Sequence, residues 1–148
     1  MAEIRFYHLQ RTSEDAALPQ IALKAWQAGH KVVVKCTDTD HVERLNNALW
    51  TFRPEVFLPH GSKADGAGVR QPVWLTDADD NPNGARTLIV GTGAVSEQVG
   101  AYDLSCIMLN GNEAAQVEAA RSLWKVYKDA GHTVSYWQQG EQGWEKKA

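Results

Sequence analysis

The densest group of chemically capable side chains lies at residues 36–41, where Cys36, Asp38, Asp40 and His41 occur together. Thiolate, imidazole and carboxylate groups are the usual protein ligands of zinc, but a zinc site ordinarily recruits two spaced pairs of Cys or His. The sequence offers no second pair. The two aspartates are better explained as turn and helix-capping residues. We therefore predict no metal site.

A nucleotide site is the next kind of chemistry to test. A dinucleotide site needs a glycine-rich loop between the first strand and the first helix, because glycine lets backbone amides approach a phosphate. That loop, residues 10–13, contains no glycine. The segment Gly91-Thr92-Gly93 lacks the third glycine and is interpreted as a turn after a strand.

Catalytic arrangements are equally absent from the sequence pattern. We find no nucleophile elbow, no paired-carboxylate motif and no Cys–His arrangement, so we predict no catalytic residue and no cofactor. His8 and His60 lie in or beside apolar segments, and we expect each to satisfy a local hydrogen bond. Cys36 and Cys106 are expected to be buried free thiols.

Strand-like and helix-like segments alternate along the chain. Apolar, β-branched runs predict strands, and capping residues followed by glycine stops predict helices. The predicted strands are residues 4–9, 31–36, 72–75, 87–90, 104–109 and 132–137, and the predicted helices are 13–29, 38–50 and 112–130. This order predicts a single-domain, Rossmann-like α/β fold, a mostly parallel sheet flanked by helices, with no nucleotide site.

Length and charge limit the remaining possibilities. The 148 residues form one α/β domain, 1–137, followed by a polar C-terminal tail, 138–148. The apolar runs are too short to span a bilayer, and the first residues lack the pattern of a signal peptide, so we expect a cytoplasmic protein. With a net charge of −3, binding to DNA or to an acidic partner requires a local basic patch.

The predicted last helix carries such a patch. At about 100° per residue, one side gathers the residues expected to face the sheet: Ala115, Ala119, Leu123, Val126, Tyr127 and Ala130. The opposite side gathers Arg121, Lys125 and Lys128, with Val117 and Trp124 among them.

Trp124 allows two interpretations. A large aromatic ring among cations is common in binding hot spots and suits a partner with acidic residues beside an apolar or aromatic anchor. The alternative is a tryptophan at the edge of the core, flanked by ordinary solvated lysines. The residues alone favour neither.

Several segments, taken in order, resemble the chi subunit family of bacterial DNA polymerase III. They are 6–9 (Phe-Tyr-His-Leu), 25–32, 45–50, 57–61 and the last helix with Arg121, Trp124, Lys125, Tyr127 and Lys128. Each motif alone is weak, but their order and spacing cover nearly the whole chain apart from two loops and the tail.

The resemblance implies a Rossmann-like fold without a nucleotide-binding function, and two protein partners. One is the acidic, phenylalanine-terminated tail of the single-stranded DNA-binding protein. The other is the psi subunit, where it is present, which tethers chi to the clamp loader. In the family the tail is bound by basic and aromatic residues of the C-terminal helix, which match Arg121, Trp124 and Lys125.

The resemblance extends to further residues. To the tail site we assign Lys128, Val117 and Trp50 in addition, and to the psi side Phe57 and Pro59. Val117 departs from the family pattern, because a basic residue can occur there, and this weakens the expected electrostatic attraction.

We therefore expect a non-catalytic accessory subunit that contacts DNA only indirectly and no membrane. Two alternatives come from other classes. One is a nucleotide-dependent enzyme on the same topology, which the missing glycines oppose. The other is a direct binder of single-stranded DNA that uses tryptophans as stacking platforms, which the acidic net charge opposes.

Overall fold

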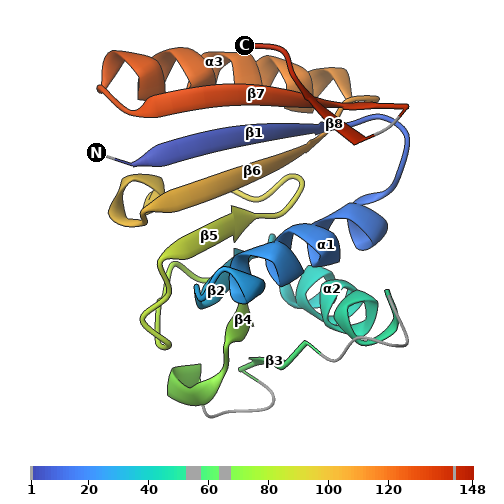
Figure 1. The fold of residues 1–148 in the computed structure, drawn as a ribbon, viewed down its shortest axis with the longest axis vertical. Helices are drawn as coiled ribbons and strands as arrows, with labels where there is room; N and C mark the ends of the chain where they lie inside the picture. Colours follow the sequence, from blue (N-terminus) through green and yellow to red (C-terminus); the bar gives the residue numbers. More distant parts are fainter. Residues whose placement is uncertain (1, 53–57, 64–67, 142) are drawn as a thin grey trace.

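Within the described residues, eight strands form one sheet in the order β3-β4-β2-β5-β6-β1-β7-β8 (Figure 1). The structure is a computed structural model that describes residues 2–52, 58–63, 68–141 and 143–148. The strands are β1 (Glu3–Leu9), β2 (Val32–Lys35), β3 (His60–Ser62), β4 (Val73–Thr76), β5 (Thr87–Val90), β6 (Leu104–Asn110), β7 (Thr133–Gly140) and β8 (Gly143–Lys146). The helices are α1 (Glu14–Gln27), α2 (Thr39–Thr51) and α3 (Ala114–Asp129), with short 3₁₀ turns at Gly68–Arg70 and Val99–Ala101.

The pairing is parallel everywhere except at β8, which pairs antiparallel with β7. Parallel strands of one sheet need long crossover connections. Helix α1 connects β1 to β2 and helix α3 connects β6 to β7, and neither pair of strands is adjacent in the sheet. The predicted fold class is confirmed. None of the described helices is long and apolar enough to cross a membrane.

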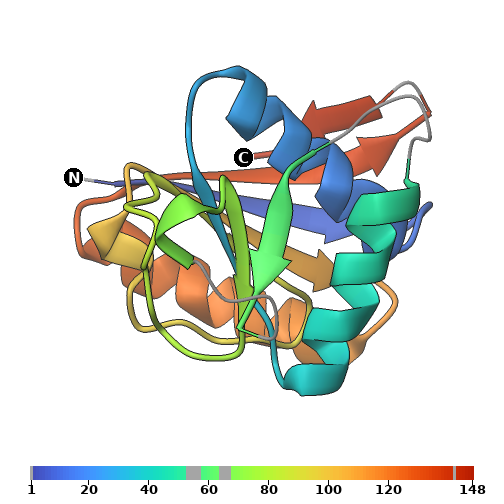
Figure 2. The same cartoon turned by 90° about the horizontal axis from the view of Figure 1, so that it is seen from below.

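Alternation along the strands divides the core into two layers. In β2, Val32 and Val34 pack with α1 and α2, whereas Val33 packs on the other face with α3-side residues. Successive strand side chains point to opposite faces, so an all-apolar strand serves both layers. Figure 2 shows α1 and α3 on opposite sides of the strands.

Local signals place the helix ends where the sequence predicts them. The Asp38 side chain accepts a hydrogen bond from the His41 backbone N–H (2.8 Å), which confirms its capping role at α2. Gly29 and Gly131 follow α1 and α3, each with φ of +91°. That conformation strains residues with a Cβ and suits glycine, so the two predicted helix stops are confirmed.

The sequence prediction misses two strands. Strand β3 lies partly in a segment expected to be loop, and β8 lies in the expected polar tail, 138–148, into which β7 also extends. Trp144 explains why β8 folds back, because its ring meets Tyr7 edge-on at 4.9 Å between centroids. A single tryptophan in a polar segment gives no periodic signal, so the pairing was not visible in the sequence.

Candidate partner-binding site

Helix α3 packs on β6 and β7 with a face different from the one predicted. Val117, Leu123, Trp124 and Tyr127 pack against the core, and Ala120 is buried. Of the residues expected to face the sheet, Ala115, Ala119, Val126 and Ala130 are instead exposed. The helix is turned by roughly a quarter turn from the predicted orientation, because burying large aromatic side chains gains more than burying alanines.

Trp124 lies at the edge of an aromatic cluster above β1 and β7. Its ring lies 6.0 Å from that of Phe6, which is fully buried, and 6.2 Å from that of Tyr136. Tyr136 in turn stacks on Phe6 at 6.2 Å. Trp124 is therefore half-buried, as the interpretation of a core-edge tryptophan requires, yet it also contributes to the surface described next.

A pocket of about 320 Å³ opens between α3 and β7. Helix α3 contributes Val117, Arg121 and Trp124 to it. The other lining residues are His8 from β1, Tyr136 and Gln138 from β7, and Ala148. Three of the predicted tail-site residues thus share one concave surface, with an aromatic and aliphatic wall and a guanidinium. We call it the α3 pocket.

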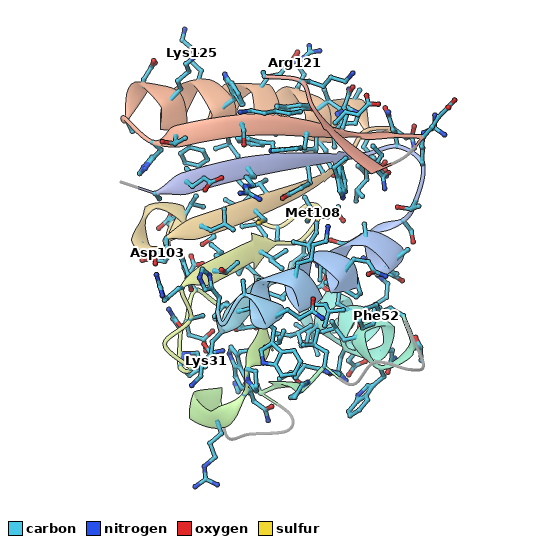
Figure 3. The ribbon with its side chains drawn as sticks, viewed as in Figure 1. Lys31, Phe52, Asp103, Met108, Arg121 and Lys125 are labelled. Carbon is cyan, nitrogen blue, oxygen red and sulfur yellow. The ribbon has the colours of Figure 1, made fainter. Side chains whose placement is uncertain are left out.

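Helix α3 carries further cations besides the one that lines the α3 pocket. Arg121, Lys125 and Lys128 are all exposed, and Figure 3 shows Arg121 and Lys125 along α3, at the end of the molecule away from Phe52. Among the described residues, no ion pair within 4.0 Å involves any of these cations. Lys128 places its Nζ 5.9 Å from the centre of the Trp124 ring, within range of a cation–π contact.

Burial shifts the pKa values of two residues that line the α3 pocket, His8 and Tyr136. It lowers the pKa of His8, and it raises the pKa of Tyr136 more than nearby Arg121 lowers it. At neutral pH the imidazole is therefore neutral and the phenol keeps its proton. The two are hydrogen-bonded, with 2.6 Å between His8 Nδ1 and the Tyr136 hydroxyl, which confirms the local role predicted for His8.

The other predicted partner residues lie elsewhere. Trp50, at the end of α2, is 54% exposed and packs its ring 4.6 Å from that of His60 in β3. Helix α2 packs on β3 and β4, across the sheet from α3, so Trp50 does not join the α3 pocket. Pro59 is half-buried close to this second surface, and Phe57 lies outside the described residues.

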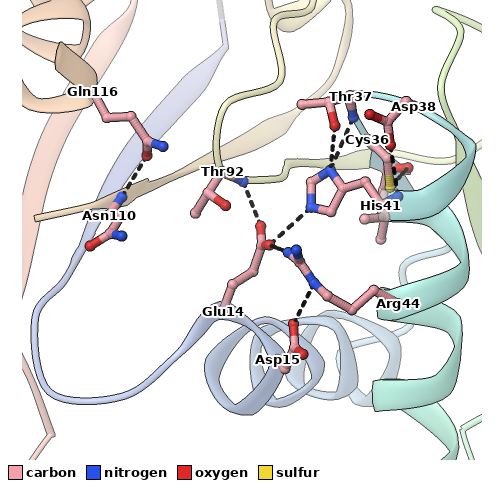
Figure 4. A network of polar contacts seen from close by, with 11 residues as sticks. Glu14, Asp15, Cys36, Thr37, Asp38, His41, Arg44, Thr92, Asn110 and Gln116 are labelled. Carbon is pink, nitrogen blue, oxygen red and sulfur yellow. Dashed lines mark hydrogen bonds and ion pairs between the residues drawn. The ribbon is translucent and has the colours of Figure 1, made fainter. Parts of the chain in front are cut away.

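A polar network occupies the ends of the parallel strands, where open α/β sheets commonly bind ligands. Its centre is Glu14, whose carboxylate is 5% exposed and accepts hydrogen bonds from Arg44, from the Thr92 N–H and from His41 Nε2, the last at 2.9 Å (Figure 4). His41 Nδ1 accepts from the Thr37 N–H at 3.0 Å, so Nε2 carries the hydrogen that faces Glu14. Burial alone raises the pKa of Glu14, but the His41 and Thr92 hydrogen bonds outweigh it, and the net pKa is lowered.

The backbone N–H groups of the loop after β1 also have hydrogen-bond acceptors within the chain. The backbone N–H groups of Gln10, Arg11 and Thr12 all donate to Gln139 Oε1, at 2.9, 2.8 and 3.2 Å. The Gln139 Nε2 donates to Thr12 Oγ1 at 2.6 Å. In nucleotide-binding relatives of this topology such amides cradle a phosphate. Here an uncharged side-chain oxygen from β7 already holds them.

The remaining reactive groups are accounted for by local contacts. Cys36 and Cys106 are buried free thiols, as predicted, and burial raises the pKa of each to about 12. His60 Nδ1 hydrogen-bonds with the Leu58 carbonyl at 2.7 Å, which confirms its predicted local role. In the part of the chain that the structure describes, no three His, Cys, Asp or Glu side chains are grouped to hold a metal ion.

Sequence reasoning missed four lining residues of the α3 pocket: His8, Tyr136, Gln138 and Ala148. For Tyr136 and Gln138 a signal existed, because residues two apart on a strand share one face. His8 stands at the end of a predicted strand, but nothing local shows which helix covers it. Ala148 had no signal at all.

Comparison with known proteins identifies the family. Residues 1–135 match the family described as DNA polymerase III chi subunit, HolC. A probable DNA polymerase III subunit chi of Rickettsia prowazekii is 34% identical over 90 residues, 61% of this chain and 54% of that protein. The chain thus spans about half the length of that relative.

Two further relatives are matched over more of their length. DNA polymerase III subunit chi of Pseudomonas aeruginosa is 27% identical over 137 residues, 90% of this chain and 94% of the relative. Its counterpart in Escherichia coli is 23% identical over 116 residues, 78% and 79% of the two chains. With a family match that runs through nearly the whole described fold, this chain belongs to the DNA polymerase III chi subunit family.

Proposed function

We propose that this chain is a non-catalytic accessory subunit of a DNA polymerase III complex, and that its α3 pocket binds the acidic, phenylalanine-terminated tail of single-stranded DNA-binding protein. The names of the relatives support the polymerase complex. The tail is our own assignment. One observation carries it: Val117, Arg121 and Trp124 line a single pocket, with Lys125 and Lys128 exposed on the same helix.

The chemistry of the pocket suits such a tail. A C-terminal phenylalanine offers an apolar ring beside a carboxylate. Trp124, Val117 and Tyr136 supply an apolar wall, and Arg121 supplies a fork of N–H donors that matches a carboxylate. The preceding acidic residues of the tail would meet Lys125 and Lys128 on the exposed side of α3. Because Val117 supplies no charge, we expect the apolar contacts to carry a large share of the affinity.

A second surface is proposed for psi. Trp50 is more than half exposed beside His60, and Pro59 directly precedes His60 in the chain. Phe57 lies just outside the described residues. Because Trp50 lies near the edge of the sheet far from α3, psi bound there would leave the α3 pocket open. One face would then hold the clamp loader and the other the DNA-coating protein.

The deciding experiment uses single-stranded DNA coated with intact or tail-less binding protein. In sedimentation, this chain should travel with the intact complex and not with the tail-less one, although the DNA remains coated in both. Calorimetry with the tail peptide should give a micromolar dissociation constant, because a flexible peptide must become ordered. Equal recruitment by the tail-less protein would reject the proposal.

A further inference from the structure

The C-terminal segment, residues 143–148, folds back beside β7 at the edge of the sheet (Figure 1). Its last residue, Ala148, lines the α3 pocket. After β8 the chain continues along β7, and two successive N–H groups, those of Lys147 and Ala148, donate to the Tyr136 carbonyl, at 2.7 and 3.4 Å. The Tyr136 N–H donates back to the Ala148 carbonyl at 3.3 Å. Two residues thus oppose one, which is the pattern of a β-bulge.

The bulge determines which way these residues face. Directly opposed residues in an antiparallel pair share a face of the sheet. Lys146 opposes Trp137, which packs with the α1 layer of the core. Lys147 and Ala148 both oppose Tyr136, which packs with the α3 layer. The bulge therefore turns two consecutive residues toward α3, and Ala148 lines the pocket.

The segment is also fixed at its other end. Trp144 pairs with Gln139 in the hairpin and packs its ring on Tyr7 in the α1 layer of the core. This anchor holds β8 against β7 without using any side chain of the α3 pocket. We therefore expect the hairpin to persist when residues 147–148 are altered.

We propose that residues 147–148 form the outer wall of the peptide site, so that an acidic peptide is bound in a groove between α3 and the C-terminal segment. The inference rests on the proposed function and adds a determinant outside α3. Without this wall, the pocket would be an open shelf of α3 over β7. A shelf leaves one side of a bound ring in water, whereas a groove excludes water from both sides and strengthens the apolar and charged contacts.

An ion pair within the C-terminal segment should affect the affinity for the peptide. The Lys147 Nζ is paired with Glu145 Oε2 at 3.1 Å, and both residues lie on the α3 side of the hairpin. The carboxylate thereby offsets the lysine. Removing it with Glu145→Gln should free Lys147 for the acidic peptide and tighten binding by about twofold, an effect typical of an exposed charge.

The test is calorimetry with an acidic, phenylalanine-terminated peptide and three variants besides the starting chain. Deleting residues 147–148 should weaken binding by about three- to tenfold. Ala148→Asp puts a carboxylate on the wall, where it repels the peptide and competes for Arg121, and should weaken binding by about tenfold or more. The matched control is Lys146→Ala, which also removes a charge but from the opposite face, and it should leave affinity unchanged.

The outcomes separate the two proposals. If the starting chain binds no peptide, the proposed function itself fails. If it binds but the deletion leaves affinity equal or higher, only the wall is rejected, and higher affinity would mean that the segment competes with the peptide. Thermal unfolding of each variant checks that the fold is kept. Ala148→Asp keeps the chain length, so it decides the matter if the deletion loosens β8.

Discussion

The α3 pocket and the network around Glu14 both contain charged side chains, but among the described residues the charges are paired in the network and unpaired in the pocket. In the Glu14 network each described group has a partner inside the chain: Glu14 meets His41, Arg44 and the Thr92 N–H, and Arg44 also meets Asp15 at 3.0 Å. In the α3 pocket, Arg121 forms no ion pair among the described residues and stands beside an aromatic wall.

The difference shows how to tell a structural network from a binding surface. The hollow at the strand ends is the larger, about 520 Å³, and lies where this topology usually binds ligands. Its size and place are nevertheless poor guides, because its buried carboxylate, Glu14, and the backbone N–H groups of residues 10–12 already have partners within the chain. The smaller α3 pocket combines exposed cations with an apolar wall, which is the composition that we expect of a partner-binding surface.

The largest effect is expected inside the network. Glu14→Ala leaves His41 and the Thr92 N–H without their acceptor in a buried place, so the free energy of unfolding should fall by about 3 kcal/mol. Urea denaturation measures the change. Asp15→Ala removes an exposed partner of the same Arg44 and should cost below about 1 kcal/mol. Equal losses for the two variants would mean that burial does not distinguish these carboxylates.

The network also predicts a dependence on pH. The pKa of Glu14 is lowered in the folded protein from its ordinary value of 4.5. Its contribution to stability is therefore complete above about pH 4.5 and is lost as the pH falls through the folded pKa. The stability difference between the starting chain and Glu14→Gln should shrink over that acidic range. A difference that stays constant down to the acid transition would contradict this assignment.

In the α3 pocket the expected effect is on binding instead of stability. Arg121→Ala should weaken binding of the acidic peptide by about 1.5–3 kcal/mol, because a charge-assisted hydrogen bond to a carboxylate is lost. The free energy of unfolding should change by less than about 0.5 kcal/mol. Lys24→Ala removes an exposed cation of α1 and is the control for net charge. If both variants weaken binding equally, Arg121 has no specific role.

A smaller effect tests whether the β1 loop is a closed anion site. Gln139→Ala removes the acceptor shared by three backbone N–H groups and should cost about 1 kcal/mol. The exposed amides should then accept inorganic phosphate, seen as a rise in Tm with phosphate that the starting chain lacks. The starting chain should also neither bind nor hydrolyse ATP. Phosphate stabilisation of both proteins alike would show that Gln139 does not close the site.

The smallest effect concerns salt. A short acidic peptide forms few ion pairs, so its affinity for the α3 pocket should fall only moderately between low and physiological salt. Binding of single-stranded DNA through several phosphates would fall by orders of magnitude over the same range. Calorimetry at two salt concentrations measures the slope. A steep slope for the peptide would favour the direct DNA binder over the adaptor.

The helices and strands that the sequence predicts correctly are those that depend on local patterns. The β-branched run of β2, the Asp38 cap and the glycine after α3 are each determined within a few residues, and all were predicted. The predicted orientation of α3 is wrong because the helical wheel gives alanines the same weight as Trp124. Burial follows the area of a side chain, and the aromatic residues determine the orientation.

What the sequence could not reveal depends on distant partners. Glu14 and His41 are 27 positions apart, and His8 and Tyr136 are 128 apart. Neither pair has a spacing that a local pattern can recognise. The C-terminal segment joins the α3 pocket only because β8 folds back on β7, and the short polar strand carries no periodicity of its own.

The position of β1 has a consequence for synthesis of the chain. β1 is made first but lies between β6 and β7, so that Glu3 is paired with Leu104 on one side and Thr133 on the other. A nascent chain can assemble β2, β4 and β5 while β1 has no neighbour. Such non-local pairing is slow and leaves strand edges exposed until it is made. The α3 pocket draws on β1, α3 and β7 together, so a ribosome-bound fragment lacking β7 should be unable to hold the partner. Recruitment would then begin only with the finished protein.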